Sequence, residues 1–171
     1  MTPPILSIAG HSNSGKTTLI ERLIPELSRL GYRVGTIKHD AHNFVMDHEG
    51  KDTWRMSQAG AQTVVIASAT QMAMTRRLDT EAGLEEIASW LFKDVDIIIA
   101  EGYKRSAYPK IEVVRHSPVV CAEDPQVKAL VDNREENAPD YLFPFRHKLA
   151  CFRMTDLSDI TDFVLQLLIR K

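Results

Sequence analysis

The apolar and polar positions near the N-terminus have the order typical of a strand followed by a helix. The apolar run ILSIA at residues 5–9 predicts a strand covered on both faces. From residue 16 to residue 30 the apolar positions recur at helical spacing, and Gly31 follows, so we expect the helix to end there. Pro25 removes a hydrogen bond inside this helix, and we expect it to kink the helix without breaking it.

The same alternation continues along the chain and predicts an α/β fold. We expect a mostly parallel sheet with helices on both faces. The runs 63–67 and 71–75 predict an added β-hairpin, with a second subunit or the rest of the monomer as the cover for its apolar faces. The other expected elements are helices at about 51–59, from Leu84 and from about Ser158, and strands at 33–38, 95–102 and 111–115, with weaker strand candidates at 128–131 and 149–152.

The loop between the first strand and the first helix, GHSNSGKT at residues 10–17, satisfies the pattern G-x-x-x-x-G-K-[ST]. Glycines allow the bends with which such a loop surrounds a phosphate with backbone N–H groups. The lysine faces the β and γ phosphates, the threonine hydroxyl can bind Mg²⁺, and the helix N-terminus adds partial positive charge. The motif predicts a P-loop NTPase whose nucleotide-binding residues are Gly10, His11, Ser12, Asn13, Ser14, Gly15, Lys16, Thr17 and Thr18.

A second magnesium ligand is expected on a neighbouring strand, because the carboxyl ends of parallel strands meet at one edge of the sheet. Glu101 follows the apolar run 97–100, and we expect its carboxylate to hold Mg²⁺ together with Thr17, directly or through water. A solvated acid at a strand end is the alternative. Asp96 begins the same strand and is expected at the opposite edge, away from the metal.

Polar and basic side chains gather after two of the predicted strands. The first segment, residues 39–52, contains His39, Asp40, His42, Asp47, His48 and Asp52. It has no recognised zinc spacing, and three interpretations of it stay open: a polar loop near the phosphates, a transition-metal site, or a nucleotide-responsive segment in which Asp47 or Asp52 is the catalytic candidate. After the Glu101 strand, a second anionic molecule or plain solvent is expected to face Lys104, Arg105 and Lys110.

Composition limits the classes of function. A length of 171 residues fits one nucleotide-binding domain over residues 1–171, with long rim loops at 117–148. The net charge of −2 gives no electrostatic case for a nucleic-acid or membrane partner. The two cysteines lack metal-ligand spacing, and residues 1–10 have neither a signal-peptide pattern nor an apolar run long enough to cross a membrane. We therefore expect a cytoplasmic protein.

Four segments in order resemble the molybdopterin-guanine dinucleotide biosynthesis protein B (MobB) family. They are GHSNSGKTTLIERLIPEL, GTIKHDAH, GKDTWRMSQAGA and IIIAEGYK, the last followed by PKIEVV. The resemblance implies a homodimeric, GTP-binding adaptor of molybdenum cofactor biosynthesis that uses GTP and Mg²⁺ and is at most a weak GTPase. It implies the guanylyltransferase that joins GMP to molybdopterin as a partner, and molybdopterin as a candidate ligand. It also implies that Lys38, His39 and residues 50–52 line the nucleotide site, where Lys38 and His39 become candidate contacts to a second ligand's phosphates.

The residues alone leave the base and the purpose open. Guanine preference comes from the resemblance, because the chain has no N-K-x-D sequence and VDNR at 131–134 does not match it. A nickel-type metallochaperone GTPase and an ATP-dependent small-molecule kinase are the alternatives, although the usual metal motifs of the first and the long arginine-bearing lid of the second are missing. Slow hydrolysis is expected because no arginine finger or water-orienting glutamine can be assigned.

Overall fold

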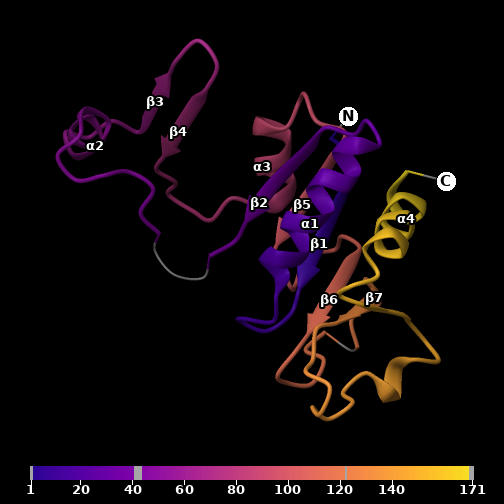
Figure 1. Cartoon of the computed structure of the whole chain (residues 1–171). Coiled ribbons are helices and arrows are strands. Elements are labelled where there is room, and N and C mark those ends of the chain that lie inside the picture. Colours follow the sequence, from indigo (N-terminus) through magenta and orange to yellow (C-terminus); the bar gives the residue numbers. More distant parts are fainter. Residues whose placement is uncertain (1, 41–43, 122, 170–171) are drawn as a thin grey trace. The chain divides into compact units, whose positions relative to one another are not determined.

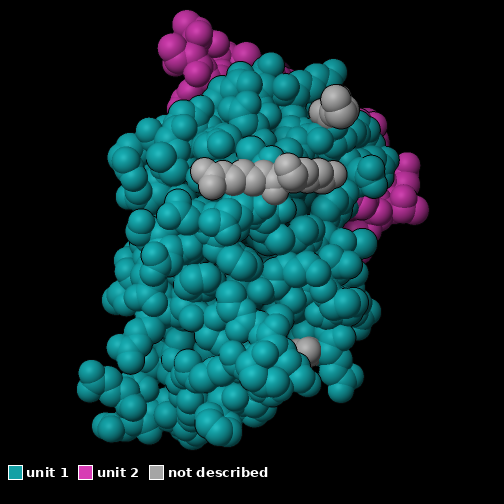
Figure 2. Space-filling view, turned by 90° about the vertical axis from the view of Figure 1, so that its right-hand side faces the viewer, with its two compact units in different colours: residues 1–39, 84–171 teal, residues 40–83 magenta. Residues whose placement is uncertain are grey.

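The structure is a computed structural model that describes residues 2–40, 44–121 and 123–169 (Figure 1). The chain divides into two compact units, one made of residues 1–39 and 84–171 and the other of residues 40–83 (Figure 2). A single domain over residues 1–171 therefore stays a prediction.

The first unit is built on a six-stranded parallel sheet with the strand order β2-β5-β1-β6-β7-β8. The central strand β1 is buried along its whole length, which explains its apolar sequence. All carboxyl ends lie along one edge, where β1 leads into the predicted nucleotide loop. The strands are β1 (Ile5–Ala9), β2 (Val34–Lys38), β5 (Ile97–Glu101), β6 (Lys110–Val114), β7 (Val127–Asp132) and β8 (Ala150–Arg153).

Helices cover both faces of this sheet, as the sequence predicts. On one face α1 (Lys16–Arg29) and α4 (Leu157–Leu168) bury their apolar stripes against β1, β5, β6 and β7. The helix α1 is continuous through Pro25, with Leu23 and Leu27 fully buried on either side. On the other face α3 (Leu84–Leu91) packs against β1, β2 and β5.

Irregular chain covers the rest of the second face, over β6, β7 and β8. The segment 117–148, which we expected to form long rim loops, contains β7 and the short 3-10 helix η1 (Phe143–Phe145). Its Leu142 is fully buried in a cluster with Leu130 of β7 and Val114 of β6. This part of the chain therefore supplies core residues on that face of the sheet.

The second unit contains α2 (Asp52–Gln58) and the predicted hairpin of β3 (Thr63–Ala67) and β4 (Met72–Arg76). Val64 is buried, whereas Val65, Ile66, Met72 and Met74 are exposed. The hairpin is a sheet of two strands, so each strand has one unpaired edge. Across both units, the described residues form no helix with the length and apolar content needed to cross a bilayer.

Candidate nucleotide-binding site

The loop between β1 and α1 has a backbone that requires its glycines. Gly10 has φ 135° and Gly15 has φ 103°, values that side chains rarely tolerate. A Cβ on Gly10 would overlap the Val113 carbonyl and come within 2.8 Å of the Ser14 hydroxyl oxygen. In the part of the chain that the structure describes, no side chain caps α1 after Gly15. The first N–H groups of the helix can therefore bind an anion.

Lys16 lies over this loop, and its ammonium donates a hydrogen bond to the His11 carbonyl at 2.6 Å. Burial lowers the pKa of Lys16, and the nearby charges of Lys104 and Lys38 lower it further, against the opposite effect of Glu101. Several ammonium groups thus converge where the motif places the β and γ phosphates. Their mutual repulsion favours a bound anion at this point.

Thr17 and Glu101 meet as the sequence predicts. The Thr17 hydroxyl donates to a carboxylate oxygen of Glu101 at 2.8 Å, and the Lys38 ammonium lies 3.7 Å from the other oxygen. Lys38 and Glu101 are register partners on adjacent parallel strands, so both side chains project toward the same face as α1. A hydroxyl and a carboxylate are oxygen ligands that suit Mg²⁺. The donor set fits the metal, and its binding stays a prediction.

The chain turns sharply after Glu101. Gly102 has φ 93° and Tyr103 has φ 46°, and the ring of Tyr103 packs against the ring of His39 with centroids 4.9 Å apart. The His39 N–H donates to the Glu101 carbonyl at 3.0 Å, which holds the ends of β2 and β5 together. Beyond this turn Lys104 and Arg105 are exposed. They are accessible to an anionic ligand, and that role stays a prediction.

Lys110 occupies a different place from the one we expected. It is the first residue of β6, its side chain is 0% exposed, and its ammonium forms an ion pair with Asp124 at 3.0 Å. It also donates to the carbonyls of Ser106 and Tyr108. Because these groups occupy the ammonium inside the protein, Lys110 holds the connection between β5 and β6 and is not placed to contact a second ligand's phosphates.

Asn133 is a residue of this site that the sequence analysis did not assign. Its side-chain amide donates to the Ser14 carbonyl at 2.8 Å, from the end of β7 to the middle of the P-loop. A Cβ on Gly15 would overlap the same amide. The residue lies in VDNR, which fails the N-K-x-D pattern. The signal that could have indicated Asn133 is its position just after a predicted strand, because polar residues at the carboxyl ends of parallel strands face the ligand edge of the sheet.

A groove of about 510 Å³ begins at Asn133 and runs between the ends of β7 and β8. Its lining is mostly charged: Asp132, Asn133, Arg134, Glu135, Glu136, Arg153, Met154 and Thr155. Because Asn133 contacts the P-loop directly, the groove adjoins the phosphate region along the same edge of the sheet. The site therefore combines a phosphate loop, a candidate metal position and an adjoining polar groove.

The two catalytic candidates belong to the second unit. Asp47 accepts the N–H of His48 at 2.8 Å, and Asp52 begins α2 with Arg55 at 3.8 Å. Both roles stay predictions, and His42 lies outside the described residues. Within the described ranges, no three His, Cys, Asp or Glu side chains gather closely enough to hold a metal ion.

Comparison with known proteins identifies the family. The family model described as MobB, molybdopterin guanine dinucleotide synthesis protein B, matches residues 5–133. The Escherichia coli molybdopterin-guanine dinucleotide biosynthesis adapter protein is 33% identical over 170 residues, which cover 95% of this chain and 92% of that one. The Haemophilus influenzae protein of the same name is 42% identical over 109 residues, or 63% of this chain and 61% of that one.

Solved structures agree with the sequence comparison. A crystal structure of molybdopterin-guanine biosynthesis protein B superposes with a TM-score of 0.73 at 33% identity and covers 96% of this chain and 99% of its own. The structure of Bacillus subtilis MobB gives a TM-score of 0.74 at 29% identity, with 98% and 99% covered. The P-loop fold, the order of the motifs and these matches lead to one conclusion: the chain belongs to the MobB family.

Proposed function

We propose that this chain is a cytoplasmic, GTP-binding adaptor in the biosynthesis of molybdopterin guanine dinucleotide. It binds GTP and Mg²⁺ at the P-loop, hydrolyses GTP slowly, and acts on the guanylyltransferase that joins GMP to molybdopterin. The observation that carries the proposal is the meeting of Thr17 and Glu101 beside the P-loop, with the ammonium groups of Lys16 and Lys38. The relatives named as molybdopterin-guanine dinucleotide biosynthesis adapter proteins support the pathway.

In this proposal each part of the site has its own role. The backbone N–H groups of residues 10–18 and the first turn of α1 hold the phosphates, with Lys16 as their point charge. The Thr17 hydroxyl and the Glu101 carboxylate hold Mg²⁺, which neutralises phosphate charge when it is bound. Lys38 already compensates Glu101 at 3.7 Å, so the carboxylate is kept in place in the absence of a metal.

The groove at the ends of β7 and β8 is the proposed place of the base. Guanine presents N–H donors that adenine lacks at the same edge, so a guanine site needs a carboxylate or carbonyl acceptor. Asp132 is already hydrogen-bonded to Arg134, whereas Glu135 and Glu136 line the groove and form no ion pair within the described part of the chain. These two glutamates are the proposed acceptors.

Slow hydrolysis follows from the groups around the phosphates. The cations that interact there are lysines, and the catalysed rate of a nucleotide switch depends on an arginine finger and a residue that orients the attacking water. Without an assigned group of either kind, we expect turnover on the order of 10⁻⁴ to 10⁻² s⁻¹.

A homodimer is part of the proposal. The hairpin exposes Val65, Ile66, Met72 and Met74, and a two-stranded sheet is marginally stable by itself. A second copy of the same hairpin has matching apolar side chains and free strand edges. Light scattering should give the mass of a dimer, and Met72→Glu should shift it toward the monomer. A monomeric mass for the protein without substitutions would contradict the proposed homodimer.

The central test is a titration with fluorescent GTP and ATP analogues in the presence of Mg²⁺. GTP should bind at least about tenfold more tightly than ATP, which corresponds to about 1.4 kcal/mol. A pull-down from native extract with GTP and with GDP should then recover the guanylyltransferase in a nucleotide-dependent manner. Equal affinity for ATP with phosphoryl transfer to a metabolite, or turnover above about one per second, would overturn the proposal.

A further inference from the structure

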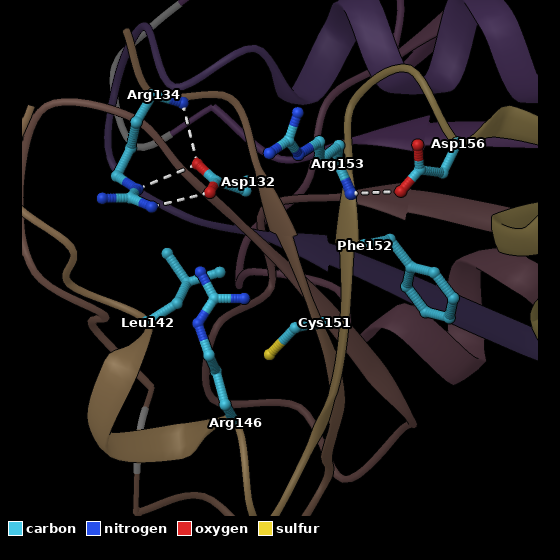
Figure 3. A pocket seen from close by; sticks show the side chains of 8 residues that line it. All are labelled: Asp132, Arg134, Leu142, Arg146, Cys151, Phe152, Arg153 and Asp156. Carbon is cyan, nitrogen blue, oxygen red and sulfur yellow. Dashed lines mark hydrogen bonds and ion pairs between the residues drawn. The ribbon is translucent and has the colours of Figure 1, made fainter. Parts of the chain in front are cut away.

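A second cavity lies beside the groove and is not part of the P-loop. It measures about 270 Å³ and is formed by the ends of β7 and β8, the turn before α4, and the chain around η1 (Figure 3). Its lining residues are Asp132, Arg134, Leu142, Arg146, Cys151, Phe152, Arg153 and Asp156. The first unit supplies all of them, and Asp132, Arg134 and Arg153 also line the groove.

Arg134 occupies most of the acceptor capacity of the Asp132 carboxylate. Arg134 donates to both of its oxygens, at 2.9 Å and 2.7 Å, and the Arg134 N–H donates as well at 3.0 Å. Burial alone would raise the pKa of Asp132, but the hydrogen bonds and charge of Arg134 outweigh it and hold this pKa below its ordinary value. The Asp132 carboxylate thus remains charged and holds the Arg134 guanidinium in place.

The other acids around the cavity are also occupied. Asp140 lies between two guanidinium groups, with one oxygen 3.0 Å from Arg134 and the other 3.2 Å from Arg146. Asp156 accepts the backbone N–H of Arg153 at 2.8 Å and the hydroxyl of Thr155 at 3.1 Å. These acids therefore already have hydrogen-bond or ion-pair partners within the protein.

The guanidinium groups of Arg153 and Arg146 have fewer partners than these acids. Arg153 is the register partner of Asp132 on the neighbouring strand, but the Asp132 carboxylate is hydrogen-bonded to Arg134 instead. Among the residues that the structure describes, no carboxylate lies within ion-pair distance of the Arg153 guanidinium. Arg146 reaches Asp140 through one terminal nitrogen, so its other N–H groups remain. Figure 3 shows the side chains of Arg146 and Arg153 among the residues that line the cavity.

We propose that this cavity binds the phosphate group of a phosphate monoester. Arg153 and Arg146 are the contact residues, because guanidinium groups bind phosphate oxygens through paired N–H donors. Arg134, whose side chain is 10% exposed, is a positioning residue that occupies Asp132 and Asp140. The volume is just below the ~300–1,000 Å³ of sites for drug-sized ligands, so it suits one phosphate with part of its ester. Phe152, which is partly exposed, is an apolar lining residue that suits that ester part.

The proposed phosphate site is separate from the P-loop, because no residue of the P-loop lines this cavity, and it shares Asp132, Arg134 and Arg153 with the groove. The probe is phenyl phosphate, titrated by calorimetry into the full-length protein saturated with GDP and Mg²⁺, which keeps the P-loop filled. Arg153→Gln and Arg146→Gln should each weaken phenyl phosphate binding about tenfold or more, the loss expected when a charge-assisted hydrogen bond is removed. Arg146 does not line the groove, so the affinity of the Arg146→Gln protein for GDP should stay within about twofold.

A matched control and a separate arm keep the two sites distinguishable. Arg29→Gln removes an exposed arginine whose one ion pair among the described residues is with Glu26 on α1, and it should change neither affinity. In Lys16→Ala protein, phenyl phosphate binding should persist and should still fall with Arg153→Gln, whether or not the protein binds GTP. Failure of the GDP-saturated protein to bind phenyl phosphate, or an equal loss with Arg29→Gln, would overturn the proposal. A parallel loss of GDP affinity in Arg146→Gln would assign the cavity to the nucleotide site and overturn the proposal as well.

Discussion

The two halves of the carboxyl edge of the sheet differ in how their charged side chains are paired. At the ends of β2 and β5, the carboxylate of Glu101 faces the ammonium groups of Lys38 and Lys16, so cations are in excess. At the ends of β7 and β8, the acids and Arg134 neutralise one another, which leaves Arg153 without an acidic partner among the described residues.

This difference reflects how each half is specified. The predicted phosphate loop is one contiguous stretch whose backbone would bind the ligand, so its proposed function depends on local conformation. The arginine cavity draws its side chains from three segments of the chain, so it depends on ion pairs that form only when the fold is complete. Changes in the first half should therefore affect ligand binding most, whereas changes in the second should affect stability most.

The largest effect is expected for Lys16→Ala. The loss of the loop's point charge should weaken GTP binding by about a hundredfold or more, because charged hydrogen bonds contribute about 1.5–3 kcal/mol each. The fold should stay intact, since among the described residues the Lys16 ammonium donates a hydrogen bond to a single group, the His11 carbonyl. A fluorescence titration and a circular dichroism melt measure both quantities. Lys93→Ala, at an exposed lysine outside the site, is the control. Unchanged GTP affinity would contradict the proposal that the P-loop binds the phosphates of GTP.

Gly15→Ala tests whether backbone conformation dominates the first half. The new Cβ would be strained at φ 103° and would overlap the Asn133 amide, so both GTP affinity and stability should fall. Gly31→Ala, at the other end of α1, is a matched control: its φ is 91°, but a Cβ there meets nothing within 4 Å. The control should lose only about 1–2 kcal/mol, the cost of the left-handed conformation. Equal losses of stability in urea denaturation would show that the Asn133 contact contributes nothing.

Arg134→Gln tests the second half. It leaves Asp132 and Asp140 without their main partner, and we expect a loss of about 2 kcal/mol in the free energy of unfolding, below the 3–5 kcal/mol of a fully buried pair. Because the folded pKa of Asp132 is lowered, its stabilisation is present above the unfolded pKa of about 3.9 and is lost as the pH falls through the folded pKa. The difference between the two proteins should thus be full at pH 6 and shrink below about pH 4.

Arg33→Gln is the control for that measurement. Arg33 pairs with Asp96 at 3.1 Å, but at the amino edge of the sheet and in solvent. Exposed ion pairs contribute little to stability, so urea denaturation should detect almost no change. A loss as large as that of Arg134→Gln would show that burial does not distinguish the two pairs.

The smallest effect among the site variants is expected for Asn133→Ala. It removes the hydrogen bond to the Ser14 carbonyl, which should cost about 1 kcal/mol of stability. GTP affinity should fall about fivefold, because the loop loses a contact that fixes its carbonyl. Asn137→Ala, at an exposed residue in the same connection, should leave both quantities unchanged. An unaltered GTP affinity in Asn133→Ala would show that the contact between the end of β7 and the P-loop does not affect GTP binding.

The sequence predicts the first half well and the second half poorly. Glycines at fixed offsets, an apolar strand and an amphipathic helix are local features, and they predict the loop and the meeting of Thr17 with Glu101. Lys110 was misplaced because residue type alone does not show that a lysine begins a buried strand beside Asp124. Asn133 and Arg134 lie on a strand end that matches no motif, and their partners are fixed by sheet order, which local periodicity does not encode.

The hydrogen bond from Asn133 to Ser14 has a thermodynamic consequence. The same connection that begins at Asn133 continues into Arg134, so a ligand that shifts the end of β7 also acts on the Ser14 carbonyl. By linkage, any factor by which an occupant of the arginine cavity changes GTP affinity must equal the factor by which GTP changes the affinity of that occupant. If both proposed ligands bind, this one amide group would couple the two halves of the edge, so that each ligand changes the affinity of the other.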